Sequence, residues 1–303
     1  MPDFSFIILT FNEEIHLPRL LKSIAPLNAE TFILDSGSTD ATLDIAEEYG
    51  AEVVYNKFIN HPKQWDFALH HFSINTPWII GLDADQIVTP ELFGLLKKFR
   101  NDAVPKNING IYFNRKNYFK GRWIKHGGYF PKYLLKMFRT NIGHSDLNQN
   151  MDHRFVVPGE TIIWKKGYLI EENLKENSIT SWIDKHNRYS TLQAQEELER
   201  KRGDRQQAVS EKLLGNPDQK TAWFKKIWFN APLFVRPMIY FIYRYFFQLG
   251  FLDGKEGFMF HFLQAFWYRL VIDIKIDELN RHSKITTLSI EEEKLETPIT
   301  SNS

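Results

Sequence analysis

The chain contains no cysteine among its 303 residues. This absence excludes a disulfide scaffold, a thiolate metal site and catalysis by a cysteine nucleophile, and it fits a reducing compartment. Neither sign of charge is in excess, since 38 Lys and Arg residues balance 37 Asp and Glu residues. With a net charge of +1, the chain lacks the overall positive field that attracts nucleic acid, so we expect no nucleic-acid partner.

Two further absences narrow the ligands and the location. The sequence has neither a Gly-x-Gly-x-x-Gly motif nor a Gly-Lys-Ser/Thr phosphate loop, which counts against dinucleotide-binding and NTPase functions. The first residues, Met-Pro-Asp-Phe-Ser-Phe-Ile-Ile-Leu, lack a basic leader and are followed by the polar Thr10. Because this apolar run is too short for a signal peptide, we expect a cytoplasmic protein.

Strands and helices alternate in the first third of the chain. Apolar runs at 4–9, 30–34, 52–55 and 78–82 are predicted strands, and the segments 15–24, 41–46 and 65–72 have helical patterns. Such alternation is typical of right-handed, parallel β-α-β units. The predicted fold class is therefore α/β, with a Rossmann-like, mostly parallel sheet flanked by helices.

Polar loops follow three of the predicted strands and should meet at one edge of the sheet, where ligands gather in open α/β folds. They are Thr10-Phe11-Asn12-Glu13, Asp35-Ser36-Gly37-Ser38-Thr39-Asp40 and Asp83-Ala84-Asp85. Ordinary turn chemistry is the alternative for each loop, because Asn, Asp, Gly and Ser are common turn residues. The two carboxylates of the third loop favour a hard divalent cation that bridges to substrate phosphates.

The ordered set of motifs resembles family 2 glycosyltransferases, which are inverting enzymes of the GT-A fold that use nucleotide-diphosphate sugars. The resemblance is to the bacterial branch that builds lipopolysaccharide core or exopolysaccharide. Besides the three loops, it rests on His126-Gly127-Gly128-Tyr129-Phe130-Pro131 and Lys185-His186-Asn187-Arg188-Tyr189. It implies metal-dependent transfer of a sugar, with Mg²⁺ or Mn²⁺ as cofactor, a UDP-sugar as the expected donor and a lipid-linked saccharide as acceptor.

The resemblance also implies a role for individual residues. The nucleotide-sugar site would comprise Thr10, Asn12, Glu13, Asp35, Ser38, Asp83, Lys185 and Arg188. Glu13 is expected at the ribose and Asp35 beside the base, although Ser36 stands where many relatives carry a second acidic residue. Asp85 would be the direct metal ligand, while Asp83 would face either the metal or the ribose.

The residues Lys185 and Arg188 lie one turn apart on a predicted helix, where both would meet the diphosphate. The alternative is a solvated basic helix face. The glycine-rich segment at 126–131 would line the acceptor site, or it would be a glycine turn packed by aromatic residues.

An inverting transfer needs a general base to deprotonate the acceptor hydroxyl. The resemblance places this base at Asp152, in Asn150-Met151-Asp152-His153-Arg154. This chain reads Asp-His-Arg where close relatives often read Asp-Glu-His, so His153 is the alternative base. Asp146 is a further, weaker candidate, and a solvated strand-edge turn is the alternative to catalysis.

The composition changes after Pro217. An aromatic and basic segment opens at Trp223 and continues to Leu249, with Arg236 and Arg244 inside the run. A membrane-spanning helix needs about 20 predominantly apolar residues, and internal charges are costly there. The pattern instead favours helices that lie on an anionic membrane surface, here the inner face of the cell membrane, or else a helical subdomain or dimer surface.

We expect three regions from these patterns. Residues 1–205 would form the GT-A domain, 206–279 a helical, membrane-associated extension and 280–303 a disordered tail. Two other functions remain as alternatives. An inactive nucleotide-sugar-binding scaffold would explain the altered Asp-His-Arg segment, whereas a sugar nucleotidyltransferase lacks its expected glycine-rich, arginine-bearing loop after the first strand.

Overall fold

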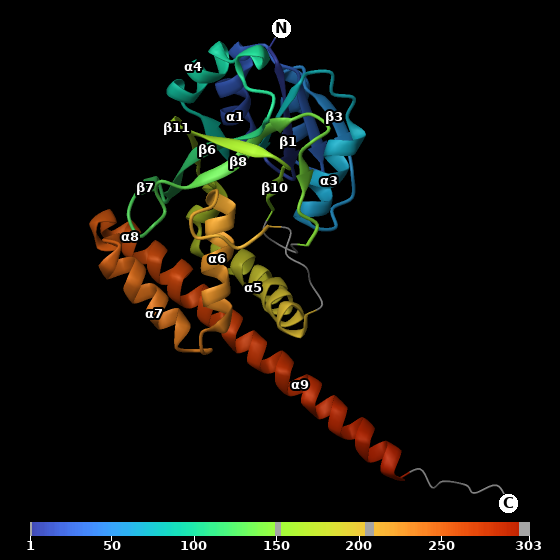
Figure 1. Cartoon of the computed structure of the whole chain (residues 1–303), viewed down its shortest axis with the longest axis vertical. Helices are drawn as coiled ribbons and strands as arrows, with labels where there is room; N and C mark the ends of the chain where they lie inside the picture. The colour runs from blue at the N-terminus through green and yellow to red at the C-terminus, as the bar shows by residue number, and fades with distance from the viewer. Residues whose placement is uncertain (1, 149–152, 204–208, 297–303) are drawn as a thin grey trace, which may run out of the picture.

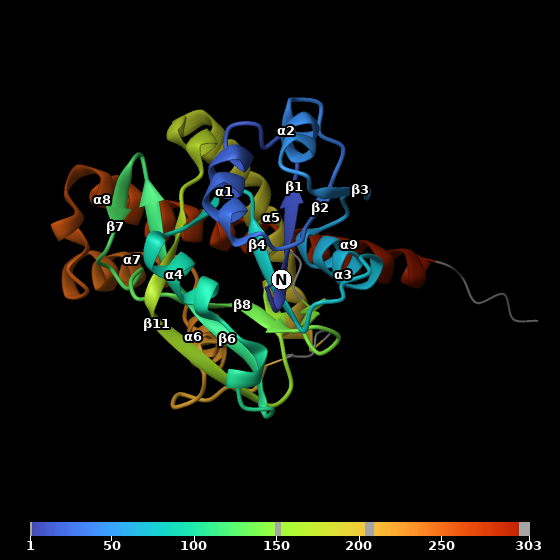
Figure 2. The same ribbon diagram turned by 90° about the horizontal axis from the view of Figure 1, so that it is seen from above.

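The computed structural model describes residues 2–148, 153–203 and 209–296, with side chains described as far as residue 282. The sheet and the helices around it form one end of the molecule, and the C-terminal helices form the other (Figure 1). Seen from above, the C-terminal helices lie behind the sheet (Figure 2). The predicted α/β architecture with a helical, aromatic-rich C-terminal region is confirmed.

Among the described residues, nine strands form the main sheet in the order β3-β2-β1-β4-β8-β6-β11-β5, with β7 paired to β6. The strands are β1 (Phe4–Thr10), β2 (Thr31–Asp35), β3 (Glu52–Tyr55), β4 (Trp78–Asp83), β5 (Gln86–Val88), β6 (Ile108–Phe119), β7 (Arg122–Ile124), β8 (Tyr133–Arg139) and β11 (Glu160–Glu171). A separate pair consists of β9 (His144–Ser145) and β10 (Phe155–Val156).

The helices are α1 (Leu17–Ile24), α2 (Thr42–Glu48), α3 (His61–His71), α4 (Pro90–Lys98), α5 (Ile179–Arg202), α6 (Pro217–Asn230), α7 (Arg236–Ile242), α8 (Gly254–His261) and α9 (Tyr268–Glu296). Helix α3 begins earlier than the apolar pattern predicted, because Asn60 caps it by accepting a hydrogen bond from Lys63 N and Pro62 lies in its first turn. Because of this earlier start, His61 is the first residue of α3.

The parallel half of the sheet positions the three polar loops. Strands β3, β2, β1 and β4 pair in parallel, with Leu9 opposite Asp83 and Thr10 opposite Asp35. The side chains of β1, β2 and β4 are mostly buried on both faces, as the apolar runs predicted, whereas those of the edge strand β3 are exposed or half-buried. The carboxyl ends of β1, β2 and β4 therefore reach the same edge of the sheet.

The other half differs from the mostly parallel sheet that we predicted. Strand β8 is antiparallel to both β4 and β6, and β5 is antiparallel to β11, whereas β6 and β11 are parallel. The chain leaves β6 through a two-residue hairpin, Lys120-Gly121, in which both residues have positive φ angles. Because a tight hairpin joins antiparallel strands, the sheet becomes mixed from this point.

The C-terminal helices pack on the rest of the protein through a shared apolar cluster. Phe119 and Ile124 from β6 and β7 meet Trp182 from α5 and Phe260 and Ile272 from α8 and α9. This cluster crosses the expected boundary at residue 205. Helix α9 runs to Glu296, into the part of the chain expected to form the tail. The expected division into three regions stays a prediction.

The two arginines of the aromatic run do not lie on the surface as an interfacial helix would present them. Arg236 and Arg244 are both buried, the first against Asp273 and the second against Gly127 O. No helix in the described part of the chain combines the length and the apolar composition needed to cross a bilayer.

Candidate active site

The loops after β1 and β2 are joined by hydrogen bonds that converge on Asp35. Its Oδ1 accepts from the hydroxyls of Thr10 (2.8 Å) and Ser38 (2.5 Å), and its Oδ2 accepts from Gly37 N and Ser38 N (both 2.7 Å). Asn12 N donates to Ser38 Oγ (2.8 Å). The four predicted residues therefore lie together. Each carboxylate oxygen of Asp35 already accepts two hydrogen bonds from the protein. The expected contact between Asp35 and the nucleotide base stays a prediction.

Glu13 connects this cluster to the short helix η3 (Leu174–Asn177). Its Oε2 lies 2.5 Å from His16 Nδ1 and its Oε1 lies 3.1 Å from Lys175 Nζ. His16 Nε2 accepts from Leu174 N (2.8 Å), so Nδ1 is the ring nitrogen that donates to Glu13. The expected contact between Glu13 and a ribose stays a prediction.

Asp83 ends β4 and is held by a buried lysine. Its Oδ2 accepts from Lys136 Nζ (2.8 Å) and Gln86 Nε2 (3.0 Å), and its Oδ1 lies 3.4 Å from His61 Nε2. Burial opposes ionisation, but the Lys136 ammonium and the His61 hydrogen bond hold the pKa of Asp83 well below its usual range. Asp83 is therefore ionised, with its charge already balanced.

Asp85 lies in the turn between β4 and β5, and its surroundings differ from those of Asp83. Its carboxylate has no hydrogen bond or ion pair among the described residues. Burial, together with the negative charges of Glu171 and Asp83, raises the pKa of Asp85 well above its usual range. We call Asp83, Asp85 and Glu171 the acidic end of the site.

Glu171 lies at the end of β11, where its Oε1 accepts from Arg115 Nη1 (2.6 Å) and its Oε2 from Gln86 Nε2 (2.9 Å). Within the described ranges, no three carboxylate or imidazole groups are arranged as a complete metal site. The site nevertheless suits a cation, because Asp85 is a carboxylate without a partner beside two other carboxylates. Mg²⁺ is commonly held by one or two carboxylates plus substrate phosphates, which this arrangement allows.

The two predicted diphosphate-binding cations are separated. Lys185 on α5 lines the cavity and donates to Glu176 Oε1 (2.6 Å), and this pairing raises its pKa against the effect of burial. Arg188 is exposed and is not among the residues that line the cavity. The residues of α5 on either side of Arg188 that line the cavity are His186 and Tyr189.

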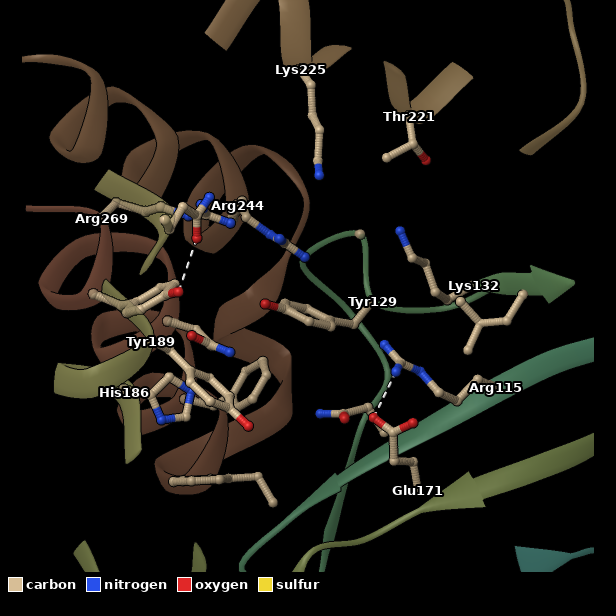
Figure 3. Close-up of a pocket in the computed structure, with 18 of the residues that line it drawn as sticks. Arg115, Tyr129, Lys132, Glu171, His186, Tyr189, Thr221, Lys225, Arg244 and Arg269 are labelled. Carbon is tan, nitrogen blue, oxygen red and sulfur yellow. Dashed lines mark hydrogen bonds and ion pairs between the residues drawn. The ribbon is translucent and has the colours of Figure 1, made fainter. Parts of the chain in front are cut away.

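A cavity of about 990 Å³ joins the acidic end to the C-terminal helices. Figure 3 shows its wall, with Arg115 and Glu171 on the sheet side and Tyr189, Arg244 and Arg269 on the helical side. Thr10, Asn12, Glu13, Asp35 and Ser38 are not among its lining residues, so they form a neighbouring cluster at the same sheet edge.

The region of the predicted base is described only in part. Asp152 lies outside the described residues. His153 lines the cavity, where its ring stacks on Trp65 at 5.2 Å. Burial and the positive charges of His61 and Lys136 hold the pKa of His153 well below its usual range. His153 is therefore neutral at physiological pH.

Asp146, the weaker candidate, is buried and lies 3.4 Å from Arg154 Nε through its Oδ2. This pairing gives Asp146 a structural role on the strand pair β9–β10.

Residues 5–155 match the model of glycosyl transferase family 2. The chain belongs to this family. A lipopolysaccharide core biosynthesis glycosyltransferase, LpsC, of Rhizobium meliloti (strain 1021) is 27% identical over 278 residues, which cover 86% of this chain and 90% of that protein. An uncharacterized glycosyltransferase of Rickettsia felis is 35% identical over 92 residues, or 30% of this chain and 32% of that protein.

Among solved structures, glucosyl-3-phosphoglycerate synthase from Mycobacterium tuberculosis in complex with UDP matches with a TM-score of 0.31 at 23% identity. The match covers 40% of this chain and 46% of that chain, so it spans less than half of the solved protein. Family membership and the named relatives make the protein a glycosyltransferase, as the motifs predicted.

Several residues of the candidate site could not be recognised from the sequence. His61, Lys136, Glu171 and Arg115 all line the cavity and hold the charges around Asp83 and Asp85. One signal was available, because Lys136 is a lysine inside the apolar run Tyr-Leu-Leu-Lys-Met-Phe of β8. The others come from segments whose position depends on the pairing of distant strands.

Proposed function

We propose that this glycosyltransferase transfers a sugar, with inversion and with the help of a divalent metal, from a UDP-sugar to a lipid-linked saccharide of the cell surface. The observation that supports it most is the carboxylate of Asp85, which has no partner among the described residues and lies beside Glu171 and Asp83. The similarity to a lipopolysaccharide core biosynthesis enzyme supports lipopolysaccharide core as the product, with exopolysaccharide as the related alternative.

The metal, Mg²⁺ or Mn²⁺, would be held by Asp85, with Asp83 close by but already paired with Lys136. When bound, it would stabilise the negative charge that develops on the leaving nucleoside diphosphate. Lys185 also lines the cavity, and its charge acts on Asp85, so it would add a second positive charge. Thr10, Asn12, Glu13, Asp35 and Ser38 would hold the nucleoside in the neighbouring cluster.

The metal and donor roles are tested together with UDP as the probe. We expect UDP to raise the melting temperature of the wild type only in the presence of Mn²⁺ or Mg²⁺, since a ligand at about 100 times its Kd stabilises by about 2.7 kcal/mol. Asp85→Asn should lose this metal response, while Asp102→Asn, which alters an exposed carboxylate on the short helix 101–103, should keep it. A metal-independent UDP response, or one unchanged in Asp85→Asn, would contradict the ligand role.

We propose Asp152 as the general base, on the resemblance alone. One observation favours His153 as a second candidate. Ser145 Oγ donates its single hydrogen to Pro62 O (2.8 Å), so it can only accept from His153 Nδ1 (3.3 Å). This leaves His153 Nε2 unprotonated, and among the described residues that atom is buried without a hydrogen-bond partner.

The two bases are separated by parallel substitutions. Asp152→Asn should abolish release of UDP from the donor in the presence of acceptor while leaving the UDP-induced stabilisation intact. His153→Asn should retain turnover. Full turnover in Asp152→Asn together with its loss in His153→Asn would transfer the role to His153. Wild-type protein that binds UDP yet turns over no UDP-, GDP- or dTDP-sugar would favour the inactive scaffold.

We propose that the glycosyltransferase lies on an anionic membrane through an exposed apolar face. The face is formed by Met238, Ile239, Ile242, Phe246, Phe247, Phe251, Leu252 and Phe258, each at least 40% exposed and Phe247 76% exposed. Ile239 also lines the cavity, so the apolar face is continuous with the site and would admit a lipid-linked acceptor from the bilayer. Lys255, exposed on α8, would contact anionic headgroups.

Sedimentation with vesicles of phosphatidylcholine and phosphatidylglycerol in equal parts tests this face. Burial of one phenylalanine side chain contributes about 1.5–3 kcal/mol. The double variant Phe247→Ser/Phe251→Ser should therefore lose most vesicle binding, whereas Phe58→Ser, a phenylalanine 53% exposed beside α3, should not. Membrane association would be contradicted if the wild-type protein did not bind the vesicles and instead sedimented as a dimer.

A further inference from the structure

The cavity carries opposite charges at its two ends. Opposite the acidic end, under the C-terminal helices, it is lined by Lys132, Arg244 and Arg269 around Tyr240. We call these three cations the basic end. In Figure 3, Lys132 and Arg244 extend toward the same space from the sheet side and the helical side, and Arg269 comes from α9.

The contacts of Arg244 at the basic end are with uncharged groups, which do not neutralise its positive charge. Its Nε donates to Gly127 O, its Nη1 donates to the hydroxyl of Tyr240, and its guanidinium lies 3.9 Å from the ring centre of Tyr129. A carbonyl, a hydroxyl and an aromatic face satisfy hydrogen bonds and dispersion, but none of them carries a full negative charge. The charge of Arg244 is therefore left uncompensated.

The other two cations also form no ion pair with an acidic side chain among the described residues, although the nearby carboxylate of Glu197 is one of the groups whose charge acts on Arg269. Among the described residues, neither Lys132 Nζ nor the Arg269 guanidinium has a hydrogen bond or an ion pair, and Arg269 packs over the rings of Trp228 (5.5 Å) and Tyr268 (5.4 Å). Arg115 Nε, between the two ends, is likewise buried without a hydrogen-bond partner in the described part of the chain.

The potential at this end is positive enough to affect neighbouring groups. Burial would raise the pKa of Tyr240, but the charges of Arg244 and Arg269 lower it below its usual value. Burial and the like charges of Arg115 and Arg244 also lower the pKa of Lys132, with Tyr240 and Asp218 opposing. An anion placed among these cations would relieve both effects.

We propose that the basic end binds a phosphate group of the acceptor. Planar guanidinium groups and an ammonium group are the side chains that bind phosphate in proteins, and three such cations suit its double negative charge. In the proposed function the acidic end holds the metal and the diphosphate of the donor, which leaves the basic end for a phosphate of the acceptor. This inference rests on the proposed function for the existence of an acceptor, and adds its chemical class.

Binding of inorganic phosphate, measured by calorimetry with a chelator present, tests the site directly. We expect Lys132→Met and Arg269→Met each to weaken binding about tenfold, since a hydrogen bond to a charged group contributes on this scale. The matched controls are Lys166→Met on β11 and Arg281→Met on α9, both exposed and absent from the cavity lining. Melting temperatures in phosphate-free buffer show whether each variant is folded.

Two results would overturn the inference: no phosphate binding by the wild type, or an equal loss in the control variants. A membrane phospholipid is the other source of phosphate. The vesicle assay should give unchanged binding for Lys132→Met, and a parallel loss there would identify a lipid headgroup and overturn the assignment to the acceptor.

The response to UDP with Mn²⁺, measured on the same samples, separates this inference from the proposed function. A normal UDP response without phosphate binding overturns the phosphate site alone. Loss of any UDP response in the wild type overturns the proposed function while phosphate binding at the basic end still stands.

Discussion

Arg236 holds the C-terminal helices together through a buried ionic group, and its removal should be costly. Its Nη2 lies 2.7 Å from Glu197 Oε2 on α5 and 2.5 Å from Asp273 Oδ1 on α9, while its Nη1 donates to Trp228 O on α6 (3.2 Å). The three charged side chains are at most 1% exposed. Arg236→Met keeps the aliphatic stem but leaves two buried carboxylates without a counter-charge, which should cost about 3–5 kcal/mol of unfolding free energy.

A matched pair on the surface calibrates this loss. Arg281 lies 2.8 Å from Asp277 on α9, but it is 75% exposed, so Arg281→Met should cost only about 0.2–1 kcal/mol. Denaturant unfolding followed by tryptophan fluorescence measures both variants. The neutral triple variant Arg236→Met/Glu197→Gln/Asp273→Asn should recover most of the loss, since no charge remains buried. A cost for Arg236→Met no greater than that of Arg281→Met would refute the reasoning.

Further predictions concern pH and packing. Burial and the nearby Arg244 charge lower the pKa of His261 to about 4 from 6.5. The unfolded chain therefore binds more protons between these values, and stability should fall by about 3 kcal/mol as the pH drops from 6.5 to 4. His261→Gln should flatten this part of a pH–stability curve, and an unchanged slope would contradict the assignment. In thermal unfolding, Gly81→Ala should lose about 1–3 kcal/mol, because its Cβ would lie 2.4 Å from the Phe155 ring, whereas Gly94→Ala in α4 meets nothing within 4 Å and should gain about 0.5–1 kcal/mol.

The parallel half of the fold could be predicted from the sequence because its signals are local. Each strand is a short apolar run, and each loop carries turn residues at the carboxyl end of its strand. Parallel pairing then brings Thr10 opposite Asp35 and Leu9 opposite Asp83, so the meeting of the loops follows from topology. Asp85 was recognisable for the same reason.

The charges around Asp85 could not be predicted in the same way. Glu171 reaches the site because β11 pairs with both β6 and β5, and Lys136 reaches Asp83 because β8 pairs antiparallel with β4. These pairings join segments more than fifty residues apart, and the hairpin at Lys120-Gly121 sets only the direction of β7 and β8 relative to β6. A local sequence pattern predicts where a strand lies in the chain, but it does not predict which other strand pairs with it.

The aromatic C-terminal run shows how the same residues support a different physical argument once their partners are known. A charged side chain in an apolar helix is stable either in water or headgroups, or next to a buried opposite charge. The sequence suggested the first arrangement for Arg236, but its partners, Glu197 and Asp273, lie 39 and 37 residues away and make the second one possible. Both arginines are buried, whereas Met238, Ile239 and Ile242 between them are exposed, and Phe247, which follows Arg244, is 76% exposed. The proposed membrane association would therefore depend on insertion of apolar side chains more than on contacts between these arginines and headgroups, and substitution of Phe247 should weaken vesicle binding more than added salt does.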